Sequence, residues 1–100
     1  MTTPAHGHDI DALRAGITGA LQAAFAPESM DLQDDSHRHA GHAGARSGAH
    51  FTLRITAAAF AGQPRLARHR LVYSALAPWM APGGGIHALV IEARAPGESA

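Results

Sequence analysis

The sequence has 100 residues, which suits a single domain, and its eight arginines balance eight acidic residues without any lysine. This neutral balance argues against a general polyanion binder, and the absence of cysteine excludes disulfides, a thiolate nucleophile and a cysteine metal site built by this chain alone. No apolar run approaches the ~20 residues needed to span a bilayer. Eight histidines are more than folding requires, so they are the first candidates for function.

Residues 1–8 predict a short disordered lead-in, since they lack the apolar region of a secretory signal and the arginine-rich character of a transit peptide. The compartment expected by default is the cytoplasm. Residues 9–26 predict a helix, because apolar residues recur in steps of three and four along one stripe. We expect Asp9 to cap this helix and Pro27 to end it.

Residues 28–35 predict a half-buried strand around Met30 and Leu32, and residues 36–49, which have no apolar period, predict a loop. Residues 50–56 give the clearest strand pattern, in which Phe51, Leu53 and Ile55 point to one side. Residues 57–62 could form one helical turn that stops at Gly62.

Residues 65–80 predict the second main helix, with Pro78 expected to kink or terminate it. At 100° per residue one face collects the large apolar side chains of Leu66, Val72, Tyr73, Leu76, Trp79 and Met80. Residues 86–93 predict the last strand, whose apolar character on both faces is typical of a central or well-covered strand. The domain is expected over residues 9–96, followed by a tail at 97–100.

The order helix, strand, strand, turn, helix, strand predicts a two-layer α+β sandwich. Because a helix lies between strand 50–56 and strand 86–93, these strands are expected to be parallel, joined by a right-handed crossover. The first two strands could pair antiparallel through the histidine-rich loop.

The histidines divide into a loop cluster and two single residues. His37, His39 and His42 could chelate a metal ion, since imidazole is the commonest metal ligand, or could belong to a hydrophilic connector. His69 falls at the centre of the apolar face of the second helix, which predicts a buried, hydrogen-bonded histidine that fixes packing. His87 starts the last strand, with the parity of Leu89 and Ile91, where a structural role and a place at the rim of a site are both open.

No catalytic constellation is found. There is no G-x-S-x-G elbow, Walker A motif or G-x-G-x-x-G motif, so an enzyme is not expected.

The chain resembles the BolA family through motifs that follow one another in the family's order between about residue 9 and residue 96. They are Asp35-Ser36-His37-Arg38-His39-Ala40-Gly41-His42-Ala43-Gly44, His50-Phe51, Ala59-Phe60-Ala61-Gly62, Arg68-His69-Arg70-Leu71-Val72-Tyr73 and Ile86-His87-Ala88-Leu89. The resemblance implies an αββααβ fold like a class II KH domain, with a three-stranded mixed sheet. It also implies a partnership with a monothiol glutaredoxin, and a [2Fe–2S] cluster shared with that glutaredoxin and glutathione. Roles in iron–sulfur cluster assembly or trafficking and in iron-responsive regulation follow from it.

Carried over onto this chain, the resemblance implies His87 as one cluster ligand. The loop supplies the second ligand, for which we expect His39, with His42 as the alternate; the chain is thus of the histidine-loop type. His69 and Tyr73 belong to the family signature and are expected to be structural. Alone, the chain is expected to be a monomer or a weak homodimer.

Two other functions are alternatives to the hypothesis that the chain shares a cluster with a glutaredoxin. Some family members are described as DNA-binding transcription regulators, for which Arg65, Arg68 and Arg70 on the second helix would contact phosphates in a salt-dependent manner. The neutral charge of the chain weakens this alternative. The third possibility is a loop that only scavenges divalent metal.

Overall fold

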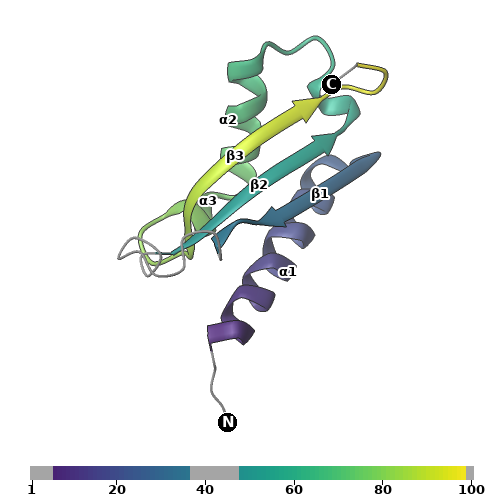
Figure 1. The fold of residues 1–100 in the computed structure, drawn as a ribbon. Helices are drawn as coiled ribbons and strands as arrows, with labels where there is room; N and C mark the ends of the chain where they lie inside the picture. The colour runs from purple at the N-terminus through teal and green to yellow at the C-terminus, as the bar shows by residue number, and fades with distance from the viewer. Residues whose placement is uncertain (1–5, 37–47, 99–100) are drawn as a thin grey trace.

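The computed structural model describes residues 6–36 and 48–98, and these residues form an α+β domain with the predicted order of elements. The elements are the helix α1 (His6–Phe25), the strands β1 (Ser29–Asp34) and β2 (Ala49–Thr56), the 3₁₀ turn η3 (Ala58–Phe60), the helices α2 (Arg65–Ala75) and α3 (Ala77–Met80), and the strand β3 (Ile86–Arg94) (Figure 1). The αββααβ order and the mixed sheet are therefore confirmed.

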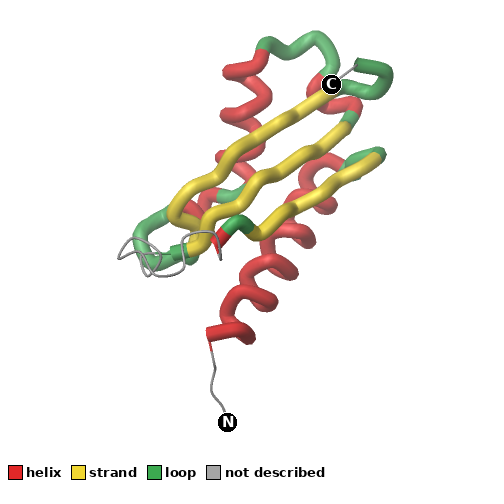
Figure 2. The backbone as a smooth tube through the Cα atoms, in the orientation of Figure 1, coloured by secondary structure: helices red, strands yellow, loops and turns green. Residues whose placement is uncertain are grey.

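The three strands form one sheet in the order β1-β2-β3. The first pair is antiparallel and the second pair is parallel, as predicted. Figure 2 shows the strands side by side, with both long helices on the same face of the sheet. The described elements thus form two layers, and none of their helices covers the second face of the sheet.

The core lies between the sheet and the helices. Phe51, Leu53 and Ile55 of β2 are buried there, against Ile17 and Leu21 of α1. The alternation that predicted this strand is confirmed, because its intervening side chains are half-buried or exposed on the other face. Burying one such side chain contributes about 1.5–3 kcal/mol, so these side chains stabilise the packing of the helical layer on the sheet.

The helix α1 begins at His6, before the predicted start at residue 9. The prediction that Asp9 caps this helix is therefore wrong, since Asp9 lies inside it. The end is as expected: the helix stops at Phe25, Ala26 takes a left-handed conformation with φ 44°, and Pro27 follows. Residues 1–5 of the expected lead-in lie outside the described residues.

The segment predicted as one helix over residues 65–80 is divided into α2 and α3. The break is at Leu76, with φ −104° and ψ 13°, two residues before Pro78. A proline inside a helix removes one hydrogen bond and its ring collides with the carbonyl four residues back, so the chain must turn here. The turn brings Trp79 of α3 against Gly16 of α1.

The prediction that the last strand is central or well covered is wrong, because β3 lies at an edge of the sheet and β2 is central. Val90 is 56% exposed on the face without helices. The strand is apolar on both faces, although among the described residues no element covers the face that carries Val90. Among the described residues, no helix is long and apolar enough to cross a membrane.

Candidate functional site

Two histidines lie side by side where the parallel strands β2 and β3 begin. The ring centroids of His50 and His87 are 5.1 Å apart, and the two ring planes are tilted by 43°. The His87 side chain is exposed and the His50 side chain is half-buried. An exposed imidazole at a strand end can bind a metal centre that another molecule brings to it.

A β-bulge directs His87 to this position. The register pairs Ala49 with Ile86 but His50 with Ala88, so His87 is the extra residue between two paired positions. Simple alternation gives His87 the parity of Leu89 and Ile91, which would turn it toward the helices. The bulge instead leaves it exposed, and bulges of this kind re-aim side chains next to functional sites.

Hydrogen bonds fix the first end of the histidine-rich segment beside His50. The backbone N–H of His50 donates to Ser36 Oγ at 3.0 Å, and the N–H of Asp35 donates to the His50 carbonyl at 2.7 Å. The Asp35 carboxylate accepts hydrogen bonds from Gln33 Nε2 at 2.7 Å and from Thr52 Oγ1 at 2.6 Å. These contacts anchor the end of β1 to the strand that carries His50.

The second end of the segment is packed against His87. Gly48 has φ +137°, a conformation that favours glycine, and a Cβ atom at this position would lie 3.0 Å from the Cβ of His87. The N–H of Ala49 donates to the Gly85 carbonyl at 2.9 Å. An open depression of about 470 Å³ adjoins this end and is lined by Gly48, Gly85, His87 and part of the turn after α3. Both ends of the segment therefore meet at the histidine pair.

His39 and His42, the candidate loop ligands, lie outside the described residues, as does His37. No three histidine or acidic side chains within residues 6–36 and 48–98 are arranged to hold a metal ion. The described part of the site therefore supplies His87 and its neighbour His50. In the sequence analysis His50 appears only as part of a motif. Because it directly precedes Phe51, which points into the core, the alternation along the strand could have shown that His50 faces away from the core.

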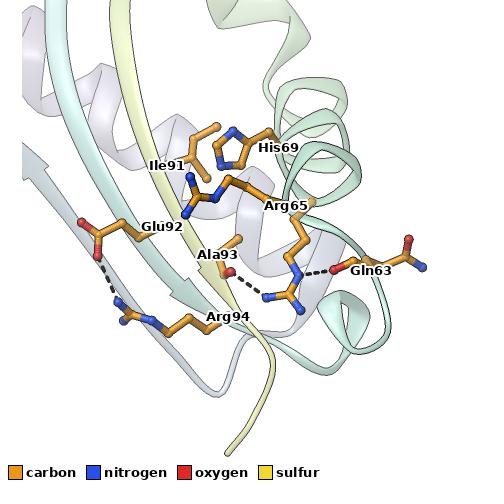
Figure 3. Close-up of a pocket in the computed structure, with 8 residues that line it drawn as sticks. Gln63, Arg65, His69, Ile91, Glu92, Ala93 and Arg94 are labelled. Atoms are coloured by element: carbon orange, nitrogen blue, oxygen red, sulfur yellow. Dashed lines mark hydrogen bonds and ion pairs between the residues drawn. The ribbon is translucent and has the colours of Figure 1, made fainter. Parts of the chain in front are cut away.

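The arginines of α2 lie at a second site, along the outer edge of β3. A cavity of about 500 Å³ is lined by Arg65, Arg68 and His69 from the helix and by residues near the end of β3 (Figure 3). Arg70 is exposed and does not line this cavity. Two of the three arginines proposed to contact DNA therefore line one cavity, and the third lies outside it.

Arg68 is tied into the fold by four hydrogen bonds. Its guanidinium donates to the carbonyls of Gln63 at 2.7 Å and Ala93 at 2.9 Å, and forms a bidentate pair with Glu98 at 2.7 and 2.8 Å. The Arg68 hydrogen bond lowers the pKa of Glu98 from 4.5 to about 2, and the pair raises the pKa of Arg68. Residue 98, expected in a tail, is thus fastened to α2.

The predicted burial of His69 at the centre of an apolar helix face is wrong. His69 is half-buried and lines the cavity beside β3, while Leu66 is 61% and Tyr73 is 42% exposed. The helix packs on the core through Val72 and Leu76. The helix therefore packs through only part of the predicted apolar stripe, because Val72 and Leu76 reach the core whereas Leu66 and Tyr73 do not.

The described residues define a two-layer αββααβ domain that presents a histidine pair at the end of its sheet, where a long segment leaves and returns. The chain belongs to the BolA-like protein family, whose model matches residues 21–98. Human BolA-like protein 1 is 38% identical over 89 residues, which cover 89% of this chain and 62% of that protein.

Two further similarities concern a regulator and a solved structure. The DNA-binding transcriptional regulator BolA of Escherichia coli is 37% identical over 79 residues, covering 79% of this chain and 71% of that protein. The structure of BolA1 from Arabidopsis thaliana superposes with a TM-score of 0.72 at 34% identity, covering 86% of this chain and 94% of the other. The resemblance inferred from the motifs is therefore confirmed.

Proposed function

We propose that this chain is a non-enzymatic partner of a monothiol glutaredoxin, with which it shares a [2Fe–2S] cluster in the cytoplasm. It would act in iron–sulfur cluster assembly or trafficking and in iron-responsive regulation. The observation that carries the proposal is the exposed His87 imidazole beside both ends of the segment that contains His39 and His42. Family membership supports it.

The donor set fits a cluster shared with another molecule. The chain has no cysteine, so sulfur ligands must come from the glutaredoxin and glutathione, while His87 and either His39 or His42 bind from this side. A [2Fe–2S] cluster supplies one-electron chemistry and an iron–sulfur unit that can be passed on. Histidine in place of thiolate raises the reduction potential, as in Rieske centres.

The role of His50 in this site is to position His87. The centroid of its ring lies 5.1 Å from that of His87. The backbone of His50 is held by hydrogen bonds with the Ser36 hydroxyl and the Asp35 N–H. Ligand residues are commonly oriented by such neighbours. Because the imidazole must be neutral to bind iron, we expect ligation from this side to weaken as pH falls.

The test is anaerobic cluster reconstitution with a monothiol glutaredoxin and glutathione, followed by visible circular dichroism and size-exclusion chromatography. Addition of this chain should give a new spectrum and a one-to-one complex. The His87→Ala variant should return the spectrum of the glutaredoxin alone, whereas His69→Ala, which changes a histidine in the other cavity, should keep the new spectrum. Parallel His39→Ala and His42→Ala variants decide between the two loop ligands.

Two results would contradict this proposal in different ways. An unchanged heterocomplex spectrum with His87→Ala removes that residue from the ligand set. No complex and no new spectrum with the unmodified chain removes the glutaredoxin partnership itself.

A second candidate function is DNA binding. The observation that favours it is the similarity to the Escherichia coli regulator, together with the exposed Arg65 and Arg70 on α2. Arg68 is already paired with Glu98, which leaves fewer cations for phosphates. Gel-shift affinity measured over a salt series tests this candidate, since phosphate contacts give a steep loss of affinity with salt.

A further inference from the structure

In the part of the chain that the structure describes, no strand pairs with the outer edge of β3. The Arg94 carbonyl accepts from the N–H of Ala57, which follows β2, at 3.0 Å, whereas the Ala93 carbonyl accepts from Arg68 outside the sheet. Backbone groups alternate in direction along a strand, so those of Leu89 and Ile91 face outward with those of Ala93. Such an edge is a template for another strand.

Among the described residues, the contacts that cap this edge lie at its C-terminal part. Arg68 donates to the Ala93 carbonyl at 2.9 Å, and the N–H of Ala95 donates to Glu98 Oε1 at 2.9 Å. Within the described residues, no strand pairs with Leu89 or Ile91 on their outer side. The cap thus stops at Ala93, and the described residues leave the edge backbone before it without a strand partner.

The helix α2 forms a groove with β3 that begins at Ile91, at the end of this stretch, and continues to Arg94 (Figure 3). The groove has a volume of about 500 Å³, with Arg65 and His69 on the helix side and Ile91 on the strand side. On the sheet face that carries no helix, the neighbouring Val90 is 56% exposed. A strand edge with a helix alongside it is the arrangement in which PDZ-type domains take up extended peptides.

The charges of the groove select an acidic occupant. Arg68 is paired with Glu98 and Arg94 with Glu92 at 3.2 Å. Arg65 is the cation of the groove that has no ion pair among the described residues. One carboxylate would complement it, and the exposed Val90 would accept an apolar side chain from the opposite face of an added strand.

We propose that the groove between α2 and the free edge of β3 binds an extended, acidic peptide segment of a partner protein by strand addition. The peptide backbone pairs with Leu89 and Ile91, an acidic side chain reaches Arg65, and an apolar neighbour covers Val90. This inference does not rest on the proposed cluster site, which lies at the starts of β2 and β3.

A peptide suits the groove better than a nucleic acid does. Nucleic acid affinity depends on several cations that neutralise phosphates. Among the described residues, this groove offers one unpaired arginine, and its other two arginines are each paired with a glutamate. Single strands are also held by stacking of bases on aromatic side chains, and among the described residues that line the groove none is a phenylalanine, tyrosine or tryptophan.

The experiment uses the full chain without a cluster and a random heptapeptide display library. Selected peptides should carry an acidic residue next to an apolar one, and they should bind in fluorescence anisotropy as labelled synthetic peptides. Arg65→Glu should weaken binding at least tenfold. The matched control is Arg70→Glu, the same charge reversal on the same helix outside the groove, and it should change affinity less than twofold.

Hydrogen exchange measured by NMR tests the strand addition itself. Bound peptide should slow exchange of the Leu89 and Ile91 amides, and lysine in place of the acidic residue should abolish binding. The proposal is overturned if no library peptide binds saturably, if Arg70→Glu weakens binding as much as Arg65→Glu, or if those amides stay unprotected. Binding of a single-stranded oligonucleotide in this groove, without peptide binding, would also overturn it.

Discussion

Glu98 shows how one side chain joins the end of the chain to the fold. Its carboxylate accepts from Arg68 and from the N–H of Ala95, and the Arg68 hydrogen bond holds its pKa at about 2 instead of 4.5. A carboxyl with a lowered pKa in the folded state stabilises the fold while it is ionised in both states. This stabilisation is present above about pH 4.5 and is lost as pH falls toward 2.

The Glu98→Gln variant tests this pH dependence, because it removes the charge but keeps an oxygen acceptor for Ala95. Above pH 5 the variant should have a lower urea midpoint than the natural chain. The difference should shrink between pH 4.5 and 2, where protonation removes the same ion pair from the natural chain. Salt should also reduce it, since the Glu98 side chain is 42% exposed. A difference that persists unchanged at pH 2 would contradict the assigned pKa.

At the scale of elements, α1 contains two glycines whose surroundings differ. A Cβ at Gly19 would meet open space, whereas one at Gly16 would lie 3.0 Å from Trp79 Cζ2 of α3. Glycine costs a helix interior about 0.5–1 kcal/mol relative to alanine. Both glycines therefore lower the stability of the helix. Gly16 also allows α1 and Trp79 of α3 to approach closely, whereas Gly19 has no such contact.

The Gly19→Ala variant should consequently raise the free energy of unfolding by about 0.5–1 kcal/mol. The Gly16→Ala variant should give no gain or a net loss, since the Trp79 ring must move to admit the methyl group. Urea denaturation of both variants at pH 7 measures the difference. Equal stabilisation by the two substitutions would show that Trp79 does not constrain α1.

The elements also show which parts of the structure a sequence can predict. The strand β2 was predictable because one of its faces packs against the helices and the other does not. Its buried apolar side chains therefore alternate with more exposed polar ones. The edge position of β3 was not, because apolar side chains on an uncovered face look the same in sequence as those in a buried strand. The bulge at His87 depends on the register between two strands that are distant in sequence.

The candidate site was predictable in its residues more than in its geometry. His87 came from a motif, and the structure adds its exposure and its neighbour His50. The arginines of α2 share a helix, but Arg68 is hydrogen-bonded to Ala93 and Glu98, which lie 25 and 30 residues away along the chain. Its guanidinium is therefore already occupied by contacts within the fold. Contacts of that range leave no trace in a local pattern.

At the scale of the whole molecule, stability depends on the contact between the helical layer and the sheet. Leu76 is fully buried in the core cluster, whereas Leu66 on the preceding helix is 61% exposed. A helical wheel gives the two leucines the same face, so the sequence predicts a similar cost for truncating either one. The structure predicts very different costs.

Leu76→Ala should lower the free energy of unfolding by about 2–5 kcal/mol, through lost burial and the cavity left behind. That is a large part of the ~5–15 kcal/mol that stabilises a typical domain, so this variant should unfold at a much lower urea concentration. Leu66→Ala should stay within about 0.5 kcal/mol of the natural chain, because it removes a largely solvated side chain. Comparable losses in the two variants would mean that α2 packs through its apolar stripe after all, and His69 would then belong inside the core rather than in the groove beside β3.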